Sequence, residues 1–199
     1  MKSGPLATVL TLTLGSIAYA PAASASSAAE TAVTTVSECM SQVTADGQSH
    51  ATRFVEARST AEAMAKLDSL ECGSGATQMM ATPNYGPCTL NPGAIYLRAS
   101  YGHNAAGNKP ITTCTVPVSK ITHANDIRYK WYTLWTKAGG TTMSYASNVA
   151  RLEQKNVNKT CQGKTNTTFI GVTLGTIVYG GKTYYARAYT PSRVLACKM

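Results

Sequence analysis

Two histidines and one lysine are the residues of this sequence that could support acid–base catalysis. His103, His123 and Lys120 all lie in its basic C-terminal part. In RNA cleavage, one histidine accepts the 2′-hydroxyl proton, the other protonates the leaving oxygen, and a cation stabilises the charged intermediate. No motif spacing supports this use, and both histidines stand in segments typical of exposed turns. A secreted basic ribonuclease or toxin-like hydrolase is therefore the alternative prediction.

Other kinds of catalysis have less support in the sequence. It contains no Gly-x-Ser-x-Gly, no His-Glu-x-x-His and no phosphate-binding glycine loop. The basic part has two carboxylates, Asp126 and Glu153, which is too few for a convincing glycosidase pair. The cysteines and histidines lack zinc-site spacing. We therefore expect a protein that is not an enzyme and that needs no metal or cofactor.

Cations alternate with aromatic residues in the segment 128–137, RYKWYTLWTK. In an extended strand successive side chains point to opposite faces, so Arg128, Lys130 and Tyr132 would share one face. A similar composition returns at 184–189. Tyrosine beside Arg or Lys suits the stacking of sugars or unpaired bases. The predicted ligand-binding residues are Arg128, Lys130, Tyr132, Trp135 and Arg187.

The opposite face of the same segment carries both tryptophans of the chain, Trp131 and Trp135. Large aromatic side chains are usually mostly buried and act as anchors of a core. We therefore expect this face to pack into the core. Trp135, which is nearer the end of the strand, would be the more exposed of the two.

The elements that would position these residues are β-strands. From residue 94 onward, runs rich in Thr, Val, Ile and Tyr follow one another without helical periodicity. Gly180-Gly181 marks a hairpin turn between the last long runs. Six or seven such runs in about 110 residues predict a mainly β module, an antiparallel β-sandwich or a small barrel.

Four sequence features together resemble a group of small secreted actinobacterial proteins. These features are Cys114 on a strand, the strand YKWYTLW, Cys161 before a Thr-rich strand, and YGGKTYYARAYTPSRVLACK. The resemblance covers about 90–199 and implies an immunoglobulin-like β-sandwich without a catalytic motif. It also implies an inter-sheet disulfide packed against Trp131, although no Tyr-x-Cys pair precedes Cys161 or Cys197.

A smaller unit is predicted at 35–80. Asp-Gly at 46-47 lies between two strand-like runs and indicates a β-hairpin. The following RSTAEAMAKLDSLE has helical spacing, with Ser59 as cap and Glu62 three residues later, as in a capping box. A β-β-α unit of this size needs a disulfide or packing against a second module for stability.

Charge divides the chain at the same place. The net charge is +9, but 30–87 has three bases against seven acids, giving −4, and 88–199 has fourteen bases against two acids, giving +12. We therefore expect an acidic hairpin-helix unit at 35–80 and a basic β-sandwich at 88–199. A cationic extracellular domain attracts anionic partners such as wall polymers, and salt weakens that attraction.

The N-terminus resembles a secretory signal peptide. Lys2 precedes an apolar run that is too short to span a membrane and that ends in small residues. We expect cleavage after Ala25, a flexible spacer at 26–34 and no transmembrane segment in the mature chain. In a secreted protein an even number of cysteines predicts disulfides. Three are expected among Cys39, Cys72, Cys88, Cys114, Cys161 and Cys197.

The main prediction is a secreted, disulfide-stabilised binding or interaction protein; the sequence does not identify its ligand, and an anionic cell-surface polymer or another extracellular protein fits best. Besides the hydrolase, the other alternative is a structural protein that binds an extracellular protein partner.

Overall fold

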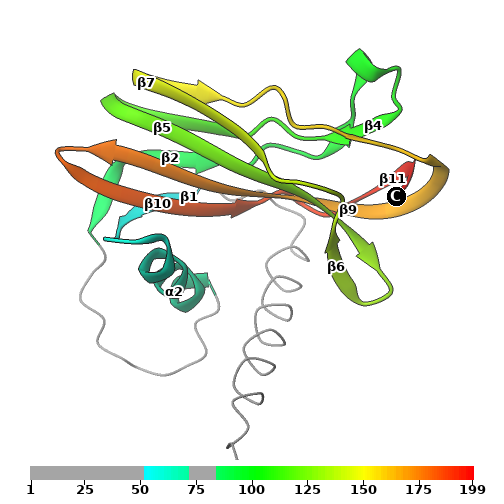
Figure 1. Ribbon diagram of the computed structural model, residues 1–199, viewed down its shortest axis with the longest axis horizontal. Coiled ribbons are helices and arrows are strands. Elements are labelled where there is room, and N and C mark those ends of the chain that lie inside the picture. The colour runs from blue at the N-terminus through cyan, green and yellow to red at the C-terminus, as the bar shows by residue number, and fades with distance from the viewer. Residues whose placement is uncertain (1–51, 72–83) are drawn as a thin grey trace, which may run out of the picture.

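The computed structural model describes residues 52–71 and 84–199. These residues form antiparallel β-sheets and one α-helix, which confirms the predicted mainly β fold (Figure 1). No helix among them is long and apolar enough to span a bilayer. The elements are β1 (Thr52–Glu56), α2 (Thr60–Glu71), β2 (Tyr85–Asn91), β3 (Tyr96–Leu97), the 3-10 helix η1 (Ala99–Tyr101), β4 (Ala105–Gly107), β5 (Ile111–Trp131), β6 (Leu134–Lys137), β7 (Thr142–Glu153), β8 (Lys159–Thr160), β9 (Gly163–Tyr179), β10 (Lys182–Tyr189) and β11 (Arg193–Lys198).

Five strands close into a barrel. The order β9-β10-β1-β2-β5 is antiparallel throughout, and β5 pairs again with β9 to complete the circuit. Residues 111–114 of β5 pair with β2, whereas 120–129 pair with β9. Strands β6 and β7 pair with β5, and β11 pairs with β9, outside this circuit. The finer prediction, an immunoglobulin-like sandwich, is not confirmed by these pairings.

The first strand, β1, pairs with strands that lie in the segment predicted as the basic module. β1 belongs to the acidic segment, but it lies inside the sheet, where Arg53 pairs with Thr89 of β2 and Val55 pairs with Tyr185 of β10. Phe54 is fully buried in the largest core cluster. The backbone groups of a strand need hydrogen-bond partners, and β2 and β10 supply them on the two sides of β1.

Helix α2 forms where its sequence pattern predicts. The backbone N–H of Glu62 donates to Ser59 Oγ (3.2 Å), and that of Arg58 donates to the Glu62 carboxylate (2.9 Å). The Glu62 N–H is one of the groups that the first helical turn leaves without partners, and the bond from Arg58 fixes the residue before the cap. Ala63 and Leu67 are buried in a second cluster against the sheet. Figure 1 shows α2 beneath the strands β1 and β10.

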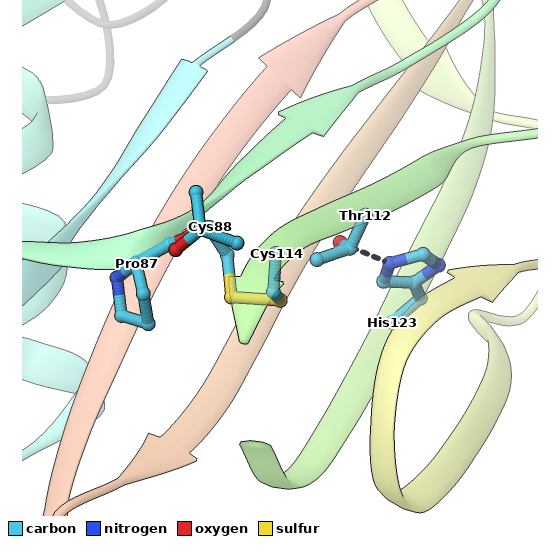
Figure 2. Close-up of a disulfide and its surroundings, with 6 residues drawn as sticks. Pro87, Cys88, Thr112, Cys114 and His123 are labelled. Carbon is cyan, nitrogen blue, oxygen red and sulfur yellow. Dashed lines mark hydrogen bonds between the residues drawn. A yellow bond between two sulfur atoms is a disulfide. The ribbon is translucent and has the colours of Figure 1, made fainter. Parts of the chain in front are cut away.

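Two of the three predicted disulfides lie in the described residues. Cys88–Cys114 links directly paired positions of β2 and β5 (Figure 2), and Cys161–Cys197 links the residue after β8 to β11. Several predicted features lie outside the described residues. They are the signal segment 1–25, the spacer at 26–34, the hairpin turn at 46-47 with the strand that precedes it, and the cysteines Cys39 and Cys72.

Candidate functional site

The structure places the two histidines in different environments. His123 has no exposed surface and shares a 2.7 Å hydrogen bond between its Nε2 and Thr112 Oγ1 (Figure 2). Burial lowers its pKa from the ordinary 6.5 to about 4, because the barrel interior disfavours the charged ring. His103 is exposed in the turn after η1. A substrate at the surface could reach His103 but not His123, so these two do not form the predicted pair.

The remaining catalytic candidate, Lys120, lies on the outside of the barrel. Its side chain is exposed, with Nζ 5.5 Å from the ring centroid of Tyr145 on β7. No group of three or more His, Cys, Asp or Glu side chains in the described ranges is arranged to hold a metal ion.

The two tryptophans occupy the reverse of their predicted positions. Trp131 is 58% exposed, whereas Trp135 is partly buried against Ile170, Val172 and Tyr189. The reason is a two-residue turn at Tyr132 and Thr133, which joins β5 to β6 and pairs Trp131 with Leu134. The segment 128–137 is therefore a hairpin and not one strand. Trp131 lies at its tip, and Trp135 lies on the returning strand.

A cleft opens where β5 and β9 separate. The two strands pair from Lys120 and Val178 to Tyr129 and Phe169, and their pairing ends there. Beyond that point 163–168 of β9 pair with β11 instead. The resulting β5–β9 cleft has a volume of about 390 Å³. Its lining residues are Tyr129, Lys130, Trp131, Tyr132, Thr165, Asn166, Thr167, Thr168, Lys198 and Met199.

The lining combines exposed aromatic rings with two lysines. Tyr132 is 86% exposed, and its ring contacts that of Trp131. Lys130 and Lys198 both line the cleft, and no lining side chain is a carboxylate. Within 52–71 and 84–199, neither lysine takes part in an ion pair. Both charges are therefore available to a ligand.

Other cations of the predicted binding set are held by acids. Arg128 lies 3.9 Å from the Asp126 carboxylate, which also binds Lys137 at 2.8 Å. Trp135 does not line the cleft, but the centroid of its ring lies 6.0 Å from Nζ of Lys130, which does. Of the five predicted residues, Lys130 and Tyr132 line the cleft.

Arg187 has a structural position on the face covered by α2. Its guanidinium donates to Asp68 Oδ1 (2.6 Å) and Glu71 Oε2 (2.7 Å) on the helix. The arginine side chain is 12% exposed and that of Glu71 15%. Burial raises the Glu71 pKa, and the hydrogen bonds from Arg187 oppose this increase. Arg187 thus joins the helix to β10 and lies outside the cleft lining.

Sequence reasoning missed most of the cleft, since two of its ten lining residues are among the predicted binding residues. Trp131 was expected in the core, and the Thr- and Asn-rich run 165–168 and Lys198 were not singled out. The polar run KTNTT at the start of β9 was the available signal, but its relation to β5 depends on long-range pairing.

Comparison with known proteins adds no relative to this description. Neither a protein-family model, nor a curated protein, nor a solved structure significantly matches the chain.

Proposed function

We propose that this chain is a secreted binding protein that holds an anionic extracellular polymer in the β5–β9 cleft. The observation that carries the proposal is that two exposed aromatic rings, Trp131 and Tyr132, line the cleft beside two lysines that form no ion pair with another described residue. Aromatic rings beside cations suit ligands that combine a ring with negative charge.

The charge of the surrounding chain supports the same ligand class. Residues 88–199 carry a net charge of +12, so a polyanion is attracted before it makes specific contacts. This long-range attraction weakens when salt shortens the Debye length, from about 10 Å at 0.1 M to about 3 Å at 1 M. Specific contacts in the cleft would then fix the ligand's position.

Secretion is part of the same proposal. It rests on the signal-like segment 1–25 and on the disulfides, because disulfides persist mainly in oxidising compartments. An extracellular polymer would therefore be the ligand that this protein meets.

The direct test is binding of the oxidised secreted protein to three polymers at low and high salt. The polymers are a polyuronate, RNA and a neutral polysaccharide. We expect binding to the polyuronate that high salt removes, and little binding to the neutral polymer. RNA is also a polyanion, so comparing it with the polyuronate distinguishes general attraction to the basic surface from recognition of a glycan. If the protein released acid-soluble fragments from RNA, the hydrolase alternative would be favoured.

Charge removal inside and outside the cleft locates the interaction. In the double variant Lys130→Gln/Lys198→Gln we expect at least a tenfold loss of affinity for the polyuronate. Lys109→Gln is the matched control, because Lys109 is exposed and does not line the cleft. The proposal fails if no anionic polymer binds, or if the double variant binds as tightly as Lys109→Gln.

A further inference from the structure

We infer that the β5–β9 cleft recognises a single sugar ring that carries a carboxylate or a phosphate, and not a run of stacked nucleobases. This inference rests on the proposed function, because it specifies which part of an anionic polymer enters the cleft. Four features support it: the ring geometry, the polar wall, the size of the cleft and the placement of its lysines.

The two aromatic rings do not form a flat platform. The Trp131 and Tyr132 rings are perpendicular, with an interplanar angle of 88° and a centroid separation of 5.4 Å. Successive bases of a single strand need aromatic faces on which each base can stack in turn. Perpendicular rings form a corner instead. One ring of a ligand can pack its C–H groups against one aromatic face while its rim contacts the other.

The opposite wall supplies hydrogen-bonding groups suited to sugar hydroxyls. Thr165, Asn166 and Thr168 lie on the part of β9 that has separated from β5, and all three line the cleft. Asn166 is exposed, and its amide can both donate and accept. Threonine hydroxyls have the same double capacity. A ring with several hydroxyl groups can therefore be bound on its polar rim while an aromatic ring contacts its apolar face.

The size of the cleft limits how much of a polymer it can hold. Its volume of about 390 Å³ lies near the lower end of the range for small-molecule pockets, about 300–1,000 Å³. This volume suits one sugar residue and part of its neighbour. A longer stretch of polymer would extend along the basic surface outside the cleft.

The lysines come from different strands, Lys130 from β5 and Lys198 from β11. Both line the cleft, so an anionic group bound there is attracted by two positive charges from different strands. A lysine acts as a compact point charge, whereas the planar fork of arginine selects oxygen pairs by geometry. The cleft therefore selects an anion on a sugar without distinguishing a uronic acid from a sugar phosphate.

Tryptophan emission gives a direct readout of this cleft. The chain has two tryptophans, so Trp135→Phe leaves Trp131 as the sole tryptophan, whose emission can be excited selectively at wavelengths that tyrosine does not absorb. We would titrate this variant with trigalacturonate, glucose 6-phosphate, neutral galactotriose and the trinucleotide of uridine. We expect saturable changes with at least one of the two anionic sugars, and affinities at least tenfold weaker for galactotriose and the trinucleotide. Calorimetry on the unmodified protein repeats the comparison without relying on the folding of the variant.

A second exposed aromatic residue provides the matched control. Tyr145 is 71% exposed and lies near Lys120, but it does not line the cleft. We expect Trp131→Ala and Tyr132→Ala each to weaken binding of the anionic sugar at least tenfold, and Tyr145→Ala to leave it unchanged.

The outcomes separate this inference from the broader function. Trinucleotide binding as tight as that of the anionic sugars would overturn it, as would equal effects of Tyr145→Ala and Trp131→Ala. Polyuronate binding that depends on the cleft lysines but survives Trp131→Ala would overturn the sugar-ring inference alone. Absence of binding to every anionic polymer would overturn both proposals.

Discussion

Thr112 and His123 lie eleven positions apart in one strand, β5, yet their side chains share a 2.7 Å hydrogen bond inside the barrel. An uninterrupted extended strand would separate them by about 35 Å, so β5 must bend back between them. The register of β5 against β7 shifts between Thr113 and Val118, and Asn148 of β7 has a φ of 54° near the same place. This bend lets β5 pair with β2 at one end and with β9 at the other, which closes the barrel.

The buried histidine makes stability depend on pH. The pKa of His123 is about 4 in the folded protein and 6.5 ordinarily, so between these values the unfolded chain binds more protons. Stability should therefore be full above about pH 6.5 and decrease as the pH falls toward 4. The loss from this one residue would be about 3 kcal/mol. The free energy of unfolding, measured with urea at pH 7 and at pH 4.5, should show this decrease in stability.

Two histidine variants isolate that contribution. His123→Leu should show a smaller loss of stability between pH 7 and 4.5 than the unmodified protein, whereas the exposed His103→Gln should retain the full loss. An NMR titration of the imidazole signals gives the His123 pKa directly, even if His123→Leu folds poorly. A measured pKa near 6.5 would contradict the prediction.

The ion pairs of Arg187 should contribute to docking of α2. Arg187→Met would leave the Glu71 carboxylate buried without its cation, and removal of one partner of such a pair costs about 3–5 kcal/mol in buried sites. Because Asp68 is partly exposed, we expect a loss near the lower end of that range, measured by denaturant unfolding. The double variant Arg187→Met/Glu71→Gln should lose less than the sum of the two single losses.

Lys182 provides a control for that measurement. It pairs with Glu56 at 3.0 Å, but its side chain is 53% exposed. Exposed pairs are screened by water and contribute little. Lys182→Gln should therefore leave the unfolding midpoint almost unchanged, and an effect as large as that of Arg187→Met would show that burial is not the cause.

Local sequence signals predicted the local structure well. The cap of α2 formed at Ser59 and Glu62, and Gly180-Gly181 formed the turn between β9 and β10 with positive φ at both residues. Each of these features depends on a few neighbouring residues with distinct conformational preferences. The helix cap and the turn therefore form with little influence from the rest of the fold.

Features that depend on distant parts of the chain were not predictable in the same way. The turn at Tyr132 and Thr133 contains no Gly, Asn, Asp or Pro, so the alternation across 128–137 indicated one continuous strand. The β5–β9 cleft exists because pairing stops at Tyr129 and Phe169, which no local pattern specifies. The change in charge between 30–87 and 88–199 does not coincide with a break in strand pairing, because β1 pairs with β2 and β10.

The remaining cysteines allow a prediction about covalent structure. Four of the six cysteines pair in the described residues, and Cys39 and Cys72 are the two that remain. We expect these two to form a third disulfide in the oxidised protein. Peptide mapping without reduction should recover one peptide pair containing them and no free thiol. Alkylation of Cys39 or Cys72 in the unreduced protein would contradict this pairing.

The backbone at the hairpin tip predicts a conflict between stability and binding. Tyr132 has a φ of 52° in the turn between β5 and β6 and is 86% exposed. The left-handed conformation costs about 1–2 kcal/mol for most residues, but asparagine tolerates it better. Tyr132→Asn should therefore raise the free energy of unfolding by about 0.5–1 kcal/mol. It should also weaken binding of the anionic sugar at least tenfold, because it removes one ring of the corner.

His103 supplies the matched control, because it has a φ of 60° in an exposed turn and does not line the cleft. His103→Asn should raise stability by less, because histidine already tolerates the left-handed region, and it should not change sugar affinity. Unfolding and binding measured on both variants then separate relief of backbone strain from loss of the ring. If Tyr132→Asn bound the sugar as tightly as His103→Asn, the exposed tyrosine would have no role in recognition, and its strained backbone would need another explanation.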